Sequence, residues 1–197
     1  MNDIEISLHA MEKEKNAIEA MMQLHDDTLP AIIQQLYDCK GRIIFCGVGK
    51  SGLIGKKLAA TFASTGSPAM FLHATEALHG DLGMVQKEDI VILLSNSGAT
   101  QEVLAAMIAL KQLQLTCIAM SAKRDSQLVK ECDAALLIPE LEEADYLHVA
   151  PTVSSTCMLV LGDAIACVLM EKKEFQKKQF HAFHPGGSLG KKLENVV

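Results

Sequence analysis

Two short turns rich in glycine and hydroxyl residues carry the clearest chemical signal in the sequence. Residues 47–52 read GVGKSG and residues 95–100 read SNSGAT, and each follows an apolar run that predicts a buried strand. Each also precedes a helical pattern, so free backbone N–H groups meet the positive end of a helix. Such a turn is an anion site, and phosphate is its usual ligand. For the second turn, helix capping by Ser97 or Thr100 is the plainer alternative.

The first turn partly matches two nucleotide-binding motifs. It contains the G-x-G-x-x-G pattern of dinucleotide sites, which also require an acidic residue at the end of the next strand. That strand is expected at residues 69–72, and the first carboxylate after it, Glu76, comes too late. A P-loop would need a glycine five residues before Gly49, where the chain has Ile44. Both nucleotide sites are therefore disfavoured, and a purely structural turn remains an alternative for this motif taken alone.

Titratable residues accompany these turns. Glu102 falls in the first turn of the helix expected after residues 95–100, where it could act as a general base or merely complement the helix dipole. His79 lies in the segment HGD and His184 in the segment HPGG, and a lone histidine is more often structural than catalytic. His181 and His184 have a spacing that could bind a metal, but no further ligands are placed to complete a site. No metal is therefore expected.

Composition limits the classes of protein to which the chain can belong. Its 197 residues suit one domain, and a hydrophobic content of 49% supports a sizeable core. A net charge of -6 without a basic stripe argues against nucleic acid as a partner. The six cysteines form no C-x-x-C pair, which fits buried thiols in a reducing cytosol. The N-terminus lacks signal-peptide order and the most apolar segment, residues 157–170, contains Asp163, so we expect a cytoplasmic protein that does not enter a membrane.

The elements that would position the candidate residues alternate between strands and helices. Strands are expected at residues 42–45, 69–72, 89–94, 116–120 and 134–138. Helices are expected at residues 4–25, 29–37, 51–64, 75–79, 100–113, 126–130 and 152–172, the last of them after a polar loop at 139–151. Strands without polar alternation are buried on both faces, as in a parallel sheet between layers of helices.

The predicted fold class is therefore α/β, with a three-layer, doubly wound, parallel five-stranded sheet flanked by helices. We expect a single domain over residues 1–197, composed of N-terminal helices at 4–38, an α/β core at 40–172 and a tail at 173–197. Ligands of such sheets bind at the carboxyl ends of the strands, near the switch in strand order. Both glycine-rich turns follow such ends.

The first helix has an apolar face and a polar face. Ile4, Leu8, Met11, Ile18 and Met21 fall near one side, and residues 12–15 (EKEK) fall on the other. The apolar side needs a cover. Packing on the protein's own sheet and contact with another subunit are equally open.

Several segments together resemble the sugar isomerase (SIS) domain and, more narrowly, the arabinose 5-phosphate isomerases. They are GVGKSG at 47–52, EALHGDLG at 76–83, SNSG at 95–98, APTVSST at 150–156 and HPGG at 184–187. The resemblance implies interconversion of D-arabinose 5-phosphate and D-ribulose 5-phosphate without a cofactor, which supplies the precursor of Kdo, a sugar of lipopolysaccharide. It also implies a cytoplasmic homotetramer with active sites between subunits. Members of that family commonly continue into a pair of CBS repeats, which do not appear in this sequence. We expect either a stand-alone form without them or a shortened piece of a longer chain.

The resemblance also assigns functional positions residue by residue. The catalytic positions correspond to Lys50, Glu102, Glu143, His184 and, as a further candidate, His79. The substrate-binding positions correspond to Gly49, Ser51, Ser95, Ser97, Thr100 and Thr152. In the implied reaction Glu102 or His184 transfers a proton through a cis-enediol, and His79 or His184 opens the sugar ring. Lys50 would stabilise the enediolate charge, and Glu143 would hold sugar hydroxyls or orient Lys50.

Two other functions remain open. One is a non-catalytic SIS regulator that binds a sugar phosphate, although such regulators usually carry a DNA-binding segment that is not seen here. The other is an SIS isomerase for another ketose phosphate, because the sequence cannot separate substrates that differ by one carbon. A downstream Kdo nucleotide sugar such as CMP-Kdo is a candidate feedback ligand of the same pocket.

Overall fold

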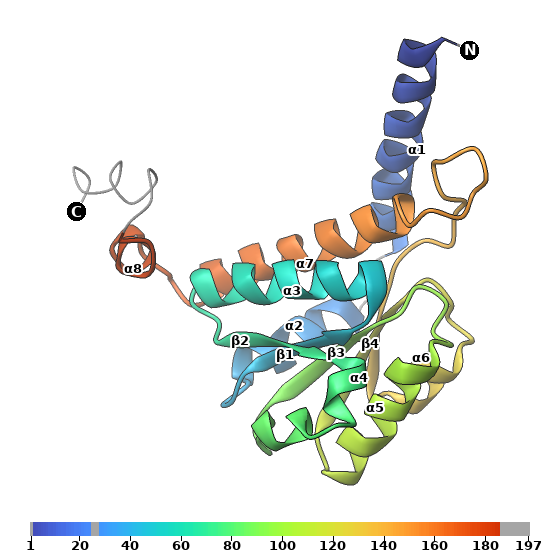
Figure 1. The fold of residues 1–197 in the computed structure, drawn as a ribbon. Helices are drawn as coiled ribbons and strands as arrows, with labels where there is room; N and C mark the ends of the chain where they lie inside the picture. The colour runs from blue at the N-terminus through green and yellow to red at the C-terminus, as the bar shows by residue number, and fades with distance from the viewer. Residues whose placement is uncertain (1, 25–27, 186–197) are drawn as a thin grey trace.

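The computed structural model describes residues 2–24 and 28–185, and a parallel sheet of five strands forms its centre (Figure 1). The strands are Ile43–Gly47 (β1), Ala69–His73 (β2), Ile90–Leu94 (β3), Thr116–Ser121 (β4) and Ala134–Leu137 (β5). Their order across the sheet is β2-β1-β3-β4-β5, and all neighbours are parallel. The predicted doubly wound sheet flanked by helices is confirmed. The end of the first expected helix, at residue 25, and the tail from residue 186 lie outside the described residues.

The sheet separates two apolar cores because its central strands have no polar face. β1 and β3 are buried at every position. In β1, Ile43 and Phe45 face one core while Ile44 and Cys46 face the other, as the period of two in a strand requires.

Helices cover both faces of the sheet (Figure 1). The first core lies under α1 (Asp3–Leu24), α2 (Thr28–Asp38), α3 (Gly49–Ser64) and α7 (Val153–Lys172). The second lies under α4 (Ala74–Ala77), α5 (Gln101–Gln112) and α6 (Gln127–Glu131). A 3-10 turn, η1 (Asp81–Met84), and a short helix, α8 (Lys177–Phe183), complete the described elements.

Helices α3 and α7 lie side by side and run in the same direction (Figure 1). Gly162 of α7 packs directly on Leu58 of α3, and a side chain at position 162 would clash with it. Further along, Gly66, just beyond α3, contacts the ring of Phe175, just beyond α7. Two contacts in the same order along both helices establish that they are parallel.

Among the described residues, α7 is the one helix long and apolar enough by composition to cross a membrane, with a mean hydropathy of 1.9. Half of that apolar window is buried inside the protein. Its buried residues belong to the first core, together with those of α1, α2 and α3. The apolar composition of α7 is therefore that of a core helix.

The first half of α1 extends away from the body of the protein (Figure 1). Ile4, Leu8 and Met11 are 71%, 60% and 64% exposed. The buried residues of α1, Ala17 and Met21, lie in its second half. Of the two alternatives left open by the sequence, packing on the protein's own fold holds for the second half of α1, while the apolar face of the first half stays uncovered in the single chain.

An ion pair ties the amino ends of β1 and β3 together. The side chain of Asp89 is fully buried, and its Oδ2 lies 2.9 Å from Nη2 of Arg42. The carboxylate also accepts hydrogen bonds from the backbone N–H groups of Arg42 and Gln86, at 2.7 and 2.9 Å. Burial alone would raise the pKa of Asp89, but these hydrogen bonds outweigh it and hold the pKa below its ordinary value.

All six cysteines are free thiols, and they differ in exposure. Cys46, Cys117 and Cys157 are buried, Cys39 and Cys132 are half-buried, and Cys167 is exposed. Burial raises the pKa of Cys46 and of Cys117 to about 12. Most of the cysteines therefore behave as small apolar core residues, as the sequence indicates.

Candidate active site

The turn between β1 and α3 depends on its glycines. Gly49 has a φ of 57°, in the left-handed region that favours glycine. A Cβ on Gly52 would lie 3.1 Å from the carbonyl oxygen of Gly47, so α3 approaches the end of β1 closely. The helix begins at Gly49, two residues before its predicted start, and its N-cap residue Val48 supplies no side-chain acceptor. The N–H groups of the first turn of α3 are therefore open to an anion.

The turn between β3 and α5 holds its hydroxyls in a fixed arrangement. Ser95 is buried, and its Oγ lies 2.8 Å from Thr100 Oγ1 and accepts a hydrogen bond from Gly98 N–H at 3.1 Å. Ser97 Oγ accepts a hydrogen bond from Ala99 N–H at 3.2 Å. Thr100 is the N-cap residue of α5, as the capping alternative predicts, but its side chain makes no capping hydrogen bond. The start of α5 is thus also open to an anion.

The two turns lie next to each other at the switch in strand order. The chain leaves β1 for β2 on one side and returns to β3 on the other, which opens a crevice at the carboxyl ends. Gly47 at the end of β1 pairs with Leu94 at the end of β3. The position required by the phosphate-site hypothesis is therefore confirmed for both turns.

Lys50 and Glu102 stand in the first turns of α3 and α5, on opposite faces of the sheet. Both are exposed. In the part of the chain that the structure describes, neither side chain forms a hydrogen bond or an ion pair. A cation and a carboxylate that have no partners of their own therefore flank the crevice, where they are available to a ligand.

Glu143 is committed to the start of α7. Its Oε2 accepts hydrogen bonds from Thr152 N–H at 2.8 Å, Thr152 Oγ1 at 3.2 Å and Ser154 N–H at 3.2 Å, and its Oε1 accepts one from the Ser154 hydroxyl. A carboxylate offers about four lone-pair sites, so these donors take up nearly all of its capacity. Within the described residues the hydrogen bonds of Glu143 go to Thr152 and Ser154, and its expected role in holding sugar hydroxyls or orienting Lys50 stays a prediction.

The starts of α3 and α7 lie at the same level. Leu58 and Gly162, which touch, are each nine residues beyond the first residue of their helices. At 1.5 Å per residue, both helix starts lie about 13 Å from that contact. Because the helices are parallel, Thr152 reaches the same end of the sheet as Lys50. One chain therefore gathers both turns, Lys50, Glu102 and the linked pair of Glu143 and Thr152 at the carboxyl ends of the strands.

Of the two candidate histidines, His184 lies away from this group. His184 follows α8, which leaves α7 near the amino end of β2, where Lys173 Nζ donates a hydrogen bond to Ser67 Oγ at 2.8 Å. Figure 1 places α8 at the opposite end of α7 from α1. There His184 stacks on Phe180, with 4.0 Å between ring centres. His79 is exposed just past α4, beside the end of β2.

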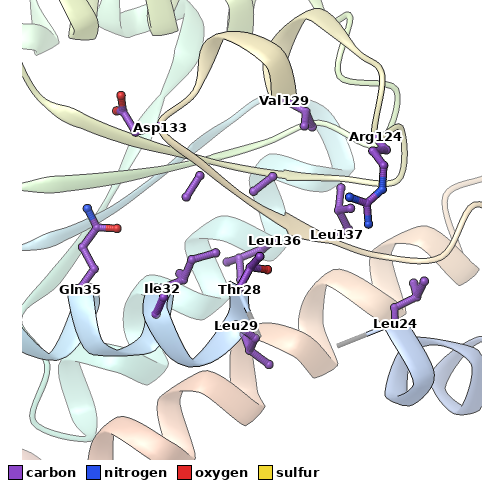
Figure 2. Close-up of a pocket in the computed structure, with 13 residues that line it drawn as sticks. Leu24, Thr28, Leu29, Ile32, Gln35, Arg124, Val129, Asp133, Leu136 and Leu137 are labelled. Atoms are coloured by element: carbon purple, nitrogen blue, oxygen red, sulfur yellow. The ribbon is translucent and has the colours of Figure 1, made fainter. Parts of the chain in front are cut away.

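A cavity of about 480 Å³ adjoins the second turn and is lined by Ser97, Ala99, Ala122, Lys123, Arg124, Asp125, Ser126 and Glu140. A larger one of about 650 Å³ lies at the free edge of β5, against α2, and is mostly apolar (Figure 2). None of the predicted site residues lines the larger cavity. A mostly apolar lining without candidate catalytic residues does not suit catalysis, so we place the candidate site at the crevice.

Among the described residues, no group of three or more His, Cys, Asp or Glu side chains is placed to hold a metal.

The turn after β4 also contributes to the site, although no residue in it was predicted to do so. Ser121 is buried, its hydroxyl donates to the Asn96 carbonyl oxygen at 3.1 Å, and it accepts a hydrogen bond from Lys123 N–H at 3.2 Å. Ser126 caps α6 and packs on Gly98, where any larger residue would clash. Through these contacts the turn after β4 supports the turn at residues 95–100. Ser121 directly follows a predicted strand, and that position is the signal that could have revealed it.

A protein-family model described as the SIS domain matches residues 35–168, which include the whole sheet. This chain belongs to the SIS-domain family. This SIS domain is 44% identical to the probable arabinose 5-phosphate isomerase of Haemophilus influenzae, over 98% of this chain and 57% of the relative. It is 41% identical to the arabinose 5-phosphate isomerase KdsD of Escherichia coli K12, over 91% of this chain and 55% of the relative. The chain thus spans little more than half the length of these curated relatives.

Solved structures share the same fold. The protein c3406 of Escherichia coli CFT073, in complex with arabinose 5-phosphate, matches this SIS domain with a TM-score of 0.91 and 46% identity, over 94% of this chain and 100% of that chain. A putative sugar-phosphate isomerase of Listeria monocytogenes matches with a TM-score of 0.90 and 32% identity, over the same shares. The Vibrio vulnificus NanR protein complexed with ManNAc-6P is 18% identical with a TM-score of 0.77, over 95% of this chain and 68% of that chain, and so shows the fold alone.

Proposed function

We propose that this SIS domain interconverts D-arabinose 5-phosphate and D-ribulose 5-phosphate. The observation that carries the proposal is the crevice between two uncapped helix starts, flanked by Lys50 and Glu102 without partners in the described part of their own chain. Similarity to KdsD and to c3406, which was solved with arabinose 5-phosphate, supports this substrate over others. The NanR protein complexed with ManNAc-6P resembles this chain in fold only, so this likeness does not favour a sensor.

The phosphate group would bind across the two turns. The backbone N–H groups that begin α3 and α5 supply donors and the positive ends of two helix dipoles. The hydroxyls of Ser51, Ser97 and Thr100 add donors, and Ser95 fixes Thr100 through the hydroxyl contact at 2.8 Å. Gly49 lets the backbone approach the ligand closely. The sugar would then extend toward Lys50, Glu102 and Thr152.

Isomerisation moves one proton between adjacent carbons. A base takes the proton from C2 of the aldose, and the electron pair forms the enediolate with charge on O1. The proton is returned to C1 while the C2 hydroxyl loses its own proton to O1, which gives the ketose with no net oxidation. Glu102 is the preferred base and Lys50 the group that stabilises the enediolate. Glu143 would position Thr152 at a sugar hydroxyl.

Ring opening by His184 would require a second copy of the chain, because His184 lies at the far end of its own subunit. We propose a homotetramer in which the exposed half of α1 contributes to contacts between subunits. Mixing Glu102→Gln with His184→Ala tests this, since random exchange of subunits would give about a quarter of the sites both intact residues. Recovery of about a quarter of native activity is expected, whereas no recovery would refute a shared site.

We further propose that the enzyme acts in the cytoplasm and supplies the precursor of Kdo. A Kdo nucleotide sugar such as CMP-Kdo is proposed as a feedback ligand of the same crevice, because a crevice built for a sugar phosphate would also suit another anionic sugar. Titration calorimetry in which CMP-Kdo gives no binding and does not compete with arabinose 5-phosphate would refute the feedback proposal alone.

A panel of ketose phosphates tests the proposed function directly. Ribulose 5-phosphate, fructose 6-phosphate and sedoheptulose 7-phosphate would be incubated with the protein, with and without a chelator, and the aldoses formed would be identified. Arabinose 5-phosphate from ribulose 5-phosphate is expected, with loss of turnover in Glu102→Gln and Lys50→Ala. Turnover of a different ketose would move the activity to another SIS isomerase, and tight binding without turnover would identify a sensor.

A further inference from the structure

Lys13 of α1 reaches the loop that precedes α7. Its Nζ donates to the carbonyl oxygen of Glu143 at 3.3 Å and lies 3.7 Å from Oε2 of Glu142. The side chain of Lys13 is 23% exposed, whereas that of Lys15 is 57% exposed and pairs with Glu12 in the same helix. The sequence places both lysines on the polar face of α1, and the loop before α7 folds against this face at Lys13.

The carbonyl group that Lys13 contacts belongs to the peptide unit between Glu143 and Ala144. His148 Nδ1 lies 3.0 Å from the same oxygen and donates to it when protonated there. On the other side of this peptide, Ala144 N–H donates to Thr152 Oγ1 at 2.8 Å. Because a peptide unit is planar, holding both of its polar atoms fixes its orientation. The direction of the Glu143 side chain and the position of the Thr152 hydroxyl are fixed with it.

The loop itself is folded tightly around Asp145. The carboxylate of Asp145 accepts hydrogen bonds from the backbone N–H groups of Leu147, Val149 and Ala150, at 3.0, 3.0 and 2.8 Å. A segment held in this way moves as one body rather than residue by residue. A contact at its Glu143 end is therefore transmitted to the residues that lead into α7.

We propose that Lys13 is a positioning residue of the isomerase site, which acts through the peptide between Glu143 and Ala144 on Thr152. The inference rests on the proposed function, in which Thr152 contacts the sugar. A hydrogen bond from an ammonium group to a carbonyl oxygen is stronger than one between neutral groups, so Lys13 contributes more to holding this peptide than a polar neutral residue would. Lys13 needs no contact with the substrate for this role.

The test compares Lys13→Met with Lys15→Met, because methionine keeps an unbranched apolar stem while removing the ammonium group. With ribulose 5-phosphate, Lys13→Met is expected to raise KM about five- to tenfold and to leave kcat within about twofold. A loosened contact at Thr152 weakens binding of the substrate in the ground state and in the transition state alike, and such a loss raises KM without changing kcat. Lys15→Met should match the wild type, and Lys13→Arg, which keeps a charged donor, should recover most of the loss.

Hydrogen exchange supplies a readout that does not depend on activity. The amides of Ala144, Thr152 and Ser154 are expected to exchange faster in Lys13→Met than in Lys15→Met and the wild type. Equal KM values and equal exchange in the two methionine variants would overturn the inference. The inference would also be overturned if light scattering showed that the raised KM of Lys13→Met comes from dissociation of the oligomer. A wild type that converts no sugar phosphate would refute the proposed function, and the exchange comparison would then decide whether Lys13 orders the loop.

Discussion

Replacing Glu143 distinguishes a residue that positions α7 from one that transfers a proton. In Glu143→Gln, the amide oxygen can accept the hydrogen bonds of Thr152 N–H, Thr152 Oγ1 and Ser154 N–H that Oε2 accepts in the native protein. The Ser154 hydroxyl, which donates to Oε1, can turn to accept from the new amide nitrogen. Glutamine thus removes the charge and keeps the hydrogen bonds, whereas Glu143→Ala removes both.

The expected losses of stability in the two variants follow from these contacts. Loss of a negative charge at the start of α7 costs about 1 kcal/mol in a partly buried position. Loss of the whole cap costs about 3 kcal/mol, of which about 1 kcal/mol is typical of a helix cap and the rest reflects hydrogen bonds to a charged group. In a domain of this size each kcal/mol lowers Tm by about 2–4 °C. We therefore expect Tm to fall by about 3 °C in Glu143→Gln and by about 9 °C in Glu143→Ala.

Calorimetry and steady-state kinetics with ribulose 5-phosphate check this prediction together. If Glu143 positions Thr152, the glutamine variant should keep kcat/KM within about tenfold of the wild type and keep the same pH–rate profile. In the alanine variant kcat/KM should fall about a hundredfold, because Thr152 loses its hydrogen bonds to Glu143. A loss of about 10² to 10⁴ in Glu143→Gln, with Tm lowered by only about 3 °C, would refute the positioning role and make Glu143 a proton-transfer group.

Further predictions concern a close-packed glycine, a buried carboxylate and the thiols. Gly52→Ala should raise KM severalfold, since its Cβ would meet a backbone oxygen of the first turn at 3.1 Å, while Gly83→Ala, with no atom within 4 Å, should leave KM unchanged. Folding lowers the pKa of Asp89, so its carboxylate stabilises the fold above about pH 4, and this stabilisation is lost as the pH falls further. Asp89→Asn should therefore lower the free energy of unfolding at pH 7 by about 2 kcal/mol and show a flatter acid-unfolding curve. An acid-unfolding curve parallel to that of the wild type would contradict this. Mass spectrometry after brief treatment with a thiol reagent should find Cys167 labelled first and Cys46 labelled only on unfolding, and early labelling of Cys46 would contradict the packing.

The sheet was predictable because its strands leave few alternatives. Residues 89–94 and 116–120 are apolar with little interruption, and a strand with no polar face must be covered on both sides. The expected strand at 89–94 corresponds to β3, Ile90–Leu94, and the expected helix at 29–37 corresponds to α2, Thr28–Asp38. Helix starts were less predictable. The structure begins α3 at Gly49, two residues before the expected start, because glycine can adopt the positive φ with which the chain enters this helix.

The positions of the two glycine-rich turns were predictable for a different reason. Their glycines and hydroxyls form local motifs, and the rule that ligands bind at the carboxyl ends of parallel strands places both motifs at one edge. Contacts between distant segments have no such local signal. Lys13 lies 130 residues from Glu143 along the chain, and its charge pattern is that of any solvated helix face. The distance of His184 from the crevice likewise depends on where α8 leaves α7, which periodicity does not specify.

A crystal structure with arabinose 5-phosphate bound tests the central claim most directly. We expect the phosphate within hydrogen-bonding distance of the turns at residues 47–52 and 95–100, including Ser51, Ser97 and Thr100, and the first two sugar carbons beside Lys50 and Glu102. A ligand seated elsewhere, such as in the apolar cavity at the edge of β5, with both turns empty, would contradict the account.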